Sequence, residues 1–170
     1  MKLALPAALT LLLSVFQTQP ARVTRVHIAK SDHTLTLYDG ERAVAVYRVA
    51  IGPGGLGPKH REGDQVTPVG HYRVVSHSPS KYRIFLRLDY PNADDRARFA
   101  ALKQAGALQK DATIGGDIGI HGTPQRHVFD LWRPLHKLTD WTAGCIAVDD
   151  DEIDQISARV KDGTPVDIDD

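Results

Sequence analysis

The sequence predicts a mainly β domain with two short helices, and three observations support this. Most of the chain after residue 22 consists of short segments that alternate apolar and polar side chains or are rich in Val, Ile and Tyr. Gly, Pro and Asp separate these segments at short intervals, and only two segments begin with helix-capping residues. The length of 170 residues fits one domain with its own core. With 21 basic and 21 acidic residues there is no cationic excess, so nucleic acid is not an expected partner.

The first 21 residues have the pattern of an export signal rather than of a folded element. Lys2 precedes an apolar run over residues 3–16, and a short polar stretch follows it. The run is too short to span a bilayer comfortably. We therefore expect a signal peptide at residues 1–21 and a mature domain at residues 22–170, exported to the periplasm or cell envelope. The alternative is an uncleaved N-terminal segment. Only in that case do we expect the protein to be tethered to the membrane.

Three strand-like segments open the mature chain. Residues 22–30 and 34–38 alternate polar and apolar side chains, which is typical of half-buried strands. The Asp39-Gly40 dipeptide that follows is a strong signal for a two-residue hairpin turn. Residues 42–51 are again rich in β-branched side chains. These segments are expected to form a three-stranded meander.

Turn and loop signals dominate the next part of the chain. The Gly and Pro residues over positions 52–60 exclude a helix or a central strand. Glu62, Asp64 and Thr67 form a polar cluster, which we interpret as a hydrogen-bonded turn rather than as a metal site. A tight turn from Thr67 to Gly70 then leads into the next strand.

The rest of the chain predicts further strands and both helices. The expected strands cover residues 72–75, 82–90, 118–121 and 166–168, with a loop at 76–80. A helix over residues 93–103 can be capped by Asn92 or Asp94, and its small apolar side chains suit packing on a sheet. The second helix starts at residues 149–151. Its buried face is expected to consist of Ile153, Ile156 and Val160.

Cys145 is the only cysteine, which is unusual for an exported chain. Secreted proteins normally use cysteines in pairs, so a single one is intermolecular, buried and inert, or reactive. His121 lies upstream in a Gly-rich, strand-like segment. A lone cysteine and a histidine are the minimal set for catalysis by a thiol nucleophile. The residues alone leave both the catalytic and the structural interpretation open.

A metal protein is the rival class. His121, His127, His136 and Cys145 have the side-chain types of a zinc site, but their spacing matches no compact zinc pattern. We expect no metal and no other cofactor.

Three stretches, taken together, resemble one known family. They are residues 62–72 with the Thr-Pro-x-Gly-x-Tyr element, residues 117–122 with Ile-His-Gly, and residues 142–147 with Thr-Ala-Gly-Cys-Ile-Ala; residues 163–166 also fit. In this order they resemble the L,D-transpeptidase catalytic-domain family over residues 23–168. The resemblance implies a mixed β-sandwich or barrel, a cysteine enzyme, and peptidoglycan stem peptides as partners. A monomer is expected.

The resemblance also implies roles for individual residues. Cys145 would be the nucleophile, and His121 the general base and acid. Gly144 and Thr142 would position the cysteine and leave room for an oxyanion hole. The candidate substrate-binding residues are Gly122, Trp141 and Arg87.

Departures from the family pattern leave the reaction outcome open. Ala143 stands where many members have His, and Ala147 stands where many have Arg. Residues 123–140 look like an insertion. The implied function is L,D-transpeptidation, which cross-links or remodels the cell wall through a cysteine thioester. The alternatives are an L,D-carboxypeptidase or a hydrolase of peptidoglycan–protein links with the same site, and a catalytically inactive wall-binding module.

Overall fold

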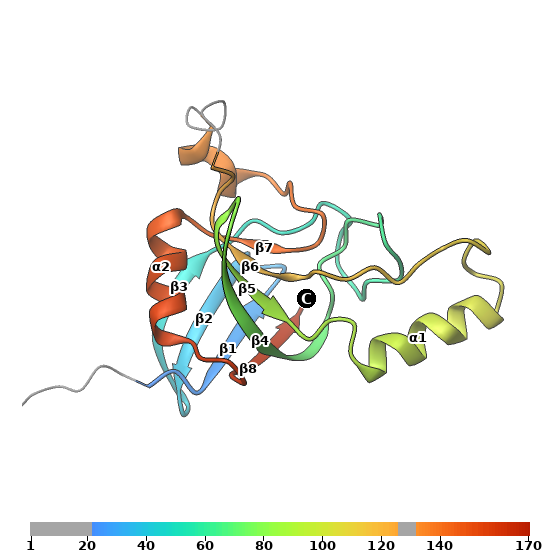
Figure 1. The fold of residues 1–170 in the computed structure, drawn as a ribbon, viewed down its shortest axis with the longest axis horizontal. Helices are drawn as coiled ribbons and strands as arrows, with labels where there is room; N and C mark the ends of the chain where they lie inside the picture. The colour runs from blue at the N-terminus through green and yellow to red at the C-terminus, as the bar shows by residue number, and fades with distance from the viewer. Residues whose placement is uncertain (1–21, 126–131) are drawn as a thin grey trace, which may run out of the picture.

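The strands form one open, mixed sheet (Figure 1), which the computed structural model describes for residues 22–125 and 132–170. The strand order within these residues is β3-β2-β1-β8-β4-β5-β6-β7. The elements are β1 Arg25–Ala29, β2 Thr34–Asp39, β3 Arg42–Arg48, β4 Gly70–Ser80, β5 Arg83–Leu88, α1 Ala93–Gln104, β6 Gly119–His121, the 3₁₀ helix η2 Arg133–Leu138, β7 Ile146–Ala147, α2 Asp150–Arg159 and β8 Pro165–Asp169. The mainly β class with two α-helices is confirmed. The sheet does not close into a barrel, although one isolated bridge joins Ala50 to Ala147.

The N-terminal meander forms as the alternating pattern predicts. β1, β2 and β3 pair antiparallel in chain order, and the aliphatic Val, Ile and Leu residues of the first two strands are fully buried. These core residues are Val26, Ile28, Leu35 and Leu37. β1 also pairs in parallel with β8, the last strand. The two ends of the domain therefore lie side by side in the middle of the sheet.

β4 is longer than the sequence predicts. The expected loop at residues 76–80 is strand, so β4 covers residues 70–80. Its first part pairs with β8 and its later part with β5, with a register shift between Val74 and Ser76. The polar composition of this stretch is typical of a loop. It forms a strand because it pairs with β5 as a hairpin beyond the edge of the core, where polar side chains are solvated.

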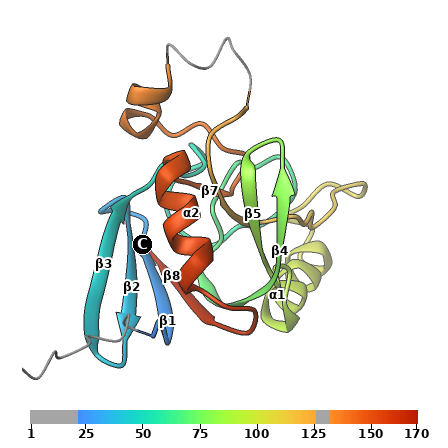
Figure 2. The same cartoon turned by 60° about the vertical axis from the view of Figure 1, so that its left-hand side comes forward.

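α2 packs on the sheet as predicted. Ile153, Ile156 and Val160 are fully buried, and Asp149 and Glu152 form a capping box at the helix start. Figure 2 shows α2 lying across the sheet, between the β1–β3 meander and the β4–β5 hairpin. Only two residues separate β7 from the helix, so its N-terminal end is fixed beside that strand.

α1 begins where the sequence predicts, but the expectation that it packs on a sheet is wrong. Asn92 caps the helix in a capping box with Asp95. The helix projects away from the sheet (Figure 1), and the small apolar side chains expected to pack are exposed. Of its residues only Asp95 is buried. Alanine side chains offer too little apolar area to hold a helix against a sheet.

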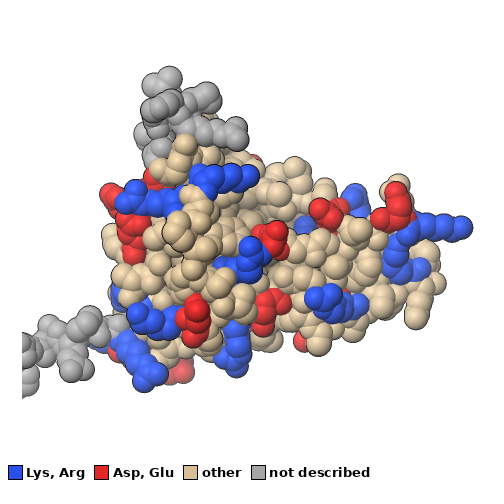
Figure 3. Space-filling model, viewed as in Figure 1, with Lys and Arg blue, Asp and Glu red and all other residues tan. Residues whose placement is uncertain are grey.

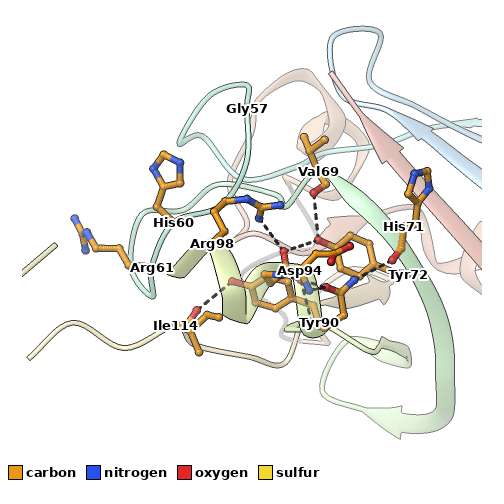
Figure 4. A network of polar contacts seen from close by, with 12 residues as sticks. Gly57, His60, Arg61, Val69, His71, Tyr72, Tyr90, Asp94, Arg98 and Ile114 are labelled. Carbon is orange, nitrogen blue, oxygen red and sulfur yellow. Dashed lines mark hydrogen bonds and ion pairs between the residues drawn. The ribbon is translucent and has the colours of Figure 1, made fainter. Parts of the chain in front are cut away.

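A polar network holds α1 in place instead (Figure 4). The Tyr72 hydroxyl and the Arg98 guanidinium donate to Asp95 Oδ1 at 3.1 and 3.0 Å. The Asn92 backbone N–H donates to Asp95 Oδ2 at 3.1 Å. Burial, followed by the nearby Asp95 charge, raises the pKa of Tyr72, so its hydroxyl remains a donor. This network ties the helix start to β4.

The surface gives no sign of a single-sign patch on the face shown in Figure 3, where acidic and basic side chains are interspersed. In the described residues, no helix has the length and apolar character needed to cross a membrane. The predicted signal peptide, residues 1–21, lies outside the described residues.

Candidate active site

Two short parallel strands bring Cys145 and His121 into one site. β6 and β7 pair with Ile120 opposite Ile146 and His121 opposite Ala147. Cys145 directly precedes β7, so it lies beside Gly119 at the start of β6. Adjacent strands are about 4.8 Å apart. The nucleophile and base candidates are therefore close neighbours, one on β6 and the other directly before β7.

His121 has a defined tautomer because of Gly122. The His121 Nδ1 lies 2.7 Å from the Gly122 carbonyl oxygen, which can only accept a hydrogen bond. The neutral ring therefore carries its proton on Nδ1, and Nε2 is the basic nitrogen. A Cβ at Gly122 would lie 2.7 Å from Asp150 Oδ1 and 2.9 Å from the Tyr82 carbonyl. Gly122 is buried, and its position supports an orienting role rather than the substrate contact expected from the resemblance.

Three aromatic rings surround the His121 imidazole. Tyr82 stacks on it at 4.4 Å, Phe85 stacks at 5.9 Å, and the edge of Trp141 lies 6.0 Å away, all measured between ring centroids. His121 is only 3% exposed. This burial, with a smaller contribution from His136, lowers the pKa of His121 to about 4, although the hydrogen bond to Gly122 opposes the shift. The imidazole is therefore neutral at pH 7 and able to accept a proton.

The Cys145 thiol lies in a more polar setting. Its Sγ is 3.4 Å from the Asp117 carbonyl oxygen, and the side chain is partly buried. Burial raises the pKa of Cys145 to about 11, and a backbone hydrogen bond from Gly119 acts in the opposite direction. Among charged neighbours, Asp117 raises this pKa, while Lys59 and Arg87 lower it. In the resting protein a neutral thiol thus lies near a neutral imidazole.

Thr142 and Gly144 shape the turn that carries Cys145. The Thr142 hydroxyl donates to the Cys145 carbonyl at 2.7 Å and accepts from the Gly144 N–H at 3.2 Å. Gly144 has a φ of 122°, and a Cβ there would lie 2.7 Å from the Val66 carbonyl oxygen. Only glycine fits this turn. Because its N–H is bonded to Thr142, Gly144 serves the site through its shape.

Hydrogen bonds to Ile51, in the segment after β3, also hold this turn. The backbone N–H groups of Trp141 and Thr142 both donate to the Ile51 carbonyl, at 3.1 and 3.2 Å. Asp140 accepts from the Ile51 N–H at 3.0 Å, and His33 Nε2 lies 3.1 Å from both of its carboxylate oxygens. The segment after β3 thus positions the turn before Cys145.

The polar cluster at residues 62–67 forms a hydrogen-bonded turn, as predicted. Asp64 pairs with the buried Lys59 at 2.5 Å and accepts from the backbone N–H groups of His60, Arg61 and Val66. Burial alone would raise the pKa of Asp64, but these bonds outweigh it and the pKa is lowered. Within the described residues, no group of three His, Cys, Asp or Glu side chains is placed to hold a metal. His127 of the postulated zinc set lies outside them.

The predicted insertion supplies a second buried histidine. His136, on η2, is 1% exposed, and its Nε2 lies 2.8 Å from Asp149 Oδ1. Its ring lies 6.1 Å from that of Trp141, which in turn contacts His121. His136 was postulated above only as a zinc ligand, and the structure instead buries its ring on η2 against Trp141 and Asp149. Residues 126–131 of the insertion lie outside the described residues.

Sequence reasoning missed the aromatic neighbours of the base and the carbonyl beside the thiol. Tyr82 and Phe85 come from the β4–β5 hairpin, and Phe85 pairs with His121 across the sheet. Strand alternation does place Phe85 and Arg87 on one face of β5, and this was the available signal. Asp117 opens the motif at residues 117–122, but the contact of its carbonyl with Cys145 depends on a backbone φ of 56°, which the motif does not specify.

Comparisons with known proteins agree with this architecture. The family model described as the L,D-transpeptidase catalytic domain (YkuD) matches residues 23–168. Pgp2 from Campylobacter jejuni, a helical cell shape determining protein, superposes with a TM-score of 0.63 at 26% identity over 86% of this chain and 47% of its own. Bd1075 from Bdellovibrio bacteriovorus, at 18% identity and a TM-score of 0.57, covers 91% of this chain and 50% of its own, and shows the fold alone.

A curated relative matches a shorter stretch. YafK of Escherichia coli (strain K12), whose name provisionally assigns it as an L,D-transpeptidase, is 35% identical over 79 residues, which are 42% of this chain and 32% of YafK. The match thus spans about a third of YafK, and about half of each solved structure named above is covered. The family model, by contrast, covers most of the chain and contains both motif segments, residues 117–122 and 142–147. This chain belongs to the L,D-transpeptidase (YkuD) catalytic-domain family.

Proposed function

We propose that this protein is a cysteine acyltransferase that forms a thioester with peptidoglycan stem peptides. The observation that carries the proposal is the pairing of β6 with β7, which sets the lone thiol beside a histidine whose basic nitrogen is Nε2. Such a pair is the minimal arrangement for covalent thiol catalysis. The proposed setting is the periplasm or cell envelope, with residues 1–21 as the export signal and residues 22–170 as the catalytic domain.

The first half-reaction forms the acyl-enzyme. Cys145 Sγ attacks the amide carbonyl carbon at the L-centre of the diamino acid in a donor tetrapeptide. The thiol proton passes to His121 Nε2. Because the thiol has a raised pKa and the imidazole a lowered one, the proton leaves the thiol during attack rather than before it. The carbon–nitrogen bond then breaks, the departing D-amino acid takes the proton from His121, and a thioester remains.

The oxyanion of the tetrahedral intermediate needs preorganised donors. With the Gly144 N–H bonded to Thr142, we assign the Cys145 backbone N–H as the main donor. Thr142 fixes this peptide by binding the Cys145 carbonyl. A single donor of this kind lowers the barrier by roughly 3 kcal/mol in other acyl-transfer sites.

The second half-reaction releases the acyl group. An acceptor amine attacks the thioester carbon, a new amide bond forms, and the sulfur returns as the thiol with the help of His121. This outcome cross-links or remodels the wall. If water attacks instead, the product is a carboxylate, and the protein is an L,D-carboxypeptidase or a hydrolase of peptidoglycan–protein links. Both outcomes use the same acyl-enzyme.

Intact-protein mass spectrometry after incubation with a carbapenem tests the acyl-enzyme. Wild-type protein is expected to gain one adduct, and Cys145→Ala none, with circular dichroism confirming that both are folded. A folded wild type without an adduct, or an adduct that persists in Cys145→Ala, would exclude Cys145 as the acylated group. Product analysis with purified tetrapeptide muropeptides, with and without an added amine acceptor, then separates transfer from hydrolysis.

A further inference from the structure

An exposed ion pair stands next to the proposed nucleophile. The Arg87 guanidinium on β5 pairs with the Asp117 carboxylate, and the side chains are 44% and 82% exposed. Arg87 lies opposite Gly119 in the β5–β6 register, and Gly119 in turn lies beside Cys145. Beside Gly119 the Phe85 ring occupies the space that a side chain would fill, and the Arg87 guanidinium lies 5.5 Å from the centroid of that ring. The Asp117 carbonyl already contacts Cys145 Sγ.

A second ion pair on β5 links the strand to another element and serves as a comparison. Arg83 pairs with Asp154 on α2 through two nitrogens, and the side chains are 42% and 41% exposed. That pair joins the hairpin to a helix. The Arg87–Asp117 pair joins β5 only to the segment that precedes β6, which the β5–β6 ladder already holds. Its two charges therefore face solvent beside the thiol without a comparable structural task.

The charges and their placement identify the chemical group that would fit. A guanidinium binds a carboxylate through two parallel hydrogen bonds, and an exposed carboxylate beside it binds an ammonium. A group that carries both charges on one carbon is the free amino-acid end of a diamino acid. The carboxylate of the departing D-amino acid fits less well, since it has no ammonium and would meet the like charge of Asp117.

We propose that Arg87 and Asp117 bind the free amino-acid end of the diamino acid whose other centre is attacked by Cys145. This inference rests on the proposed function, because that function places a diamino acid in the site. Arg87 takes the carboxylate and Asp117 the ammonium, so that the ligand replaces the pair's internal contact. The pair thus selects donor peptides in which this end is unmodified.

The test compares donor tetrapeptides that differ only in modification. One is unmodified, one carries an amide in place of the carboxylate at the free amino-acid end, one carries an acetylated ammonium there, and one carries an amide at the C-terminal D-residue. Binding is measured by calorimetry on Cys145→Ala, and kcat/KM on proteins with the thiol. The unmodified donor is expected to bind roughly tenfold or more tightly than either peptide modified at the free amino-acid end.

Variants then assign each half of the recognition. Arg87→Gln should abolish the preference over the amidated end, and Asp117→Asn the preference over the acetylated end. Arg87→Gln removes the cation near the thiol, whereas Arg87→Lys keeps it but lacks the planar fork. Compared with Arg87→Gln, Arg87→Lys should therefore have higher thiol reactivity towards iodoacetamide, without full discrimination between donors. Arg83→Gln, on the same strand and equally exposed, is the matched control and should keep the wild-type preference.

The outcomes separate this inference from the function beneath it. Equal binding of all four peptides, a preference that survives Arg87→Gln, or a preference that depends on the C-terminal D-residue carboxylate would each overturn the inference. Arg87→Gln that lowers kcat/KM by the same factor for every donor would reduce Arg87 to an electrostatic effect on the thiol. Preferential binding without any turnover by the wild type would contradict the proposed reaction while leaving the recognition intact.

Discussion

The two sides of the site differ in polarity: the side around His121 is aromatic, and the side around Cys145 is polar. His121 is enclosed by the rings of Tyr82, Phe85 and Trp141 and is almost inaccessible to water. Cys145 lies among backbone groups and charged side chains at a partly open edge. The aromatic side keeps the base neutral by excluding solvent, and the polar side gives the substrate access to the thiol. In the proposed mechanism, this separation combines a protected base, His121, with an accessible nucleophile, Cys145.

Removing the base should have the largest effect. His121→Gln cannot accept the thiol proton, so kcat/KM should fall by about 10²- to 10⁴-fold. Steady-state assays on a donor tetrapeptide, with carbapenem acylation as a second readout, measure the loss. A folded variant with near-wild-type turnover and an unchanged pH–rate profile would contradict the role of His121.

Removing an aromatic ring beside His121 should change the pKa of the imidazole without substituting His121 itself. Tyr82→Ala admits water to the imidazole, so the pKa of His121 should rise from about 4 toward 6.5. NMR titration of the ring protons measures the pKa. Tyr38→Ala is the control, because Tyr38 lies on β2, where its ring contacts Arg25 and not His121. An equal shift in both variants would mean that Tyr82 does not shield the base.

Acid should destabilise the fold through the same residue. In the unfolded chain a histidine has a pKa near 6.5, whereas folded His121 is protonated only near pH 4. As the pH falls from 6.5 to 4 the unfolded state takes up the proton first, so the free energy of unfolding decreases, by up to roughly 3 kcal/mol. Above pH 6.5 this contribution is fully present.

Urea unfolding of wild type and His121→Asn at several pH values between 7 and 4 isolates the contribution of His121. The difference in unfolding free energy between the two proteins should shrink as the pH falls. A difference that stays constant over this range would contradict the lowered pKa.

The smallest effect concerns the turn on the polar side. Thr142→Val keeps the side-chain shape but removes both hydroxyl hydrogen bonds, so the unfolding free energy should fall by about 1–2 kcal/mol and acylation by roughly tenfold. Thr142→Ser should retain most of both. The pKa of His121 should stay the same in each, and a change in it would show that the two sides are coupled.

Local signals in the sequence predicted most of the elements and the pair at the centre of the site. The Asp39-Gly40 hairpin, the Asn92 cap and the apolar stripe of α2 each depend on neighbours within a few residues, so they could be read directly. The motifs around His121 and Cys145 likewise predicted that these residues meet, and the β6–β7 register places them on adjacent strands.

The errors share a physical cause: the deciding contacts are made between elements, and the pattern of a single segment does not specify them. Residues 76–80 form a strand because β5 pairs with them, and α1 is held at its start by the Tyr72 hydroxyl on β4 rather than by its own apolar side chains. The rings around His121 come from a hairpin and from the turn before Cys145. Composition and periodicity along the chain carry no record of such contacts.

The parallel pairing of β1 with β8 has a consequence for how the protein is made. β8 lies between the meander and the β4–β7 strands, so it bridges two groups of strands that do not otherwise pair within the sheet order. During synthesis the ribosome releases β1 to β7 before the strand that joins them. Until β8 emerges, β1 and β4 each present an open hydrogen-bonding edge, which is the kind of surface that chaperones shield. Pairing of β8 with both β1 and β4 is therefore what closes these two edges.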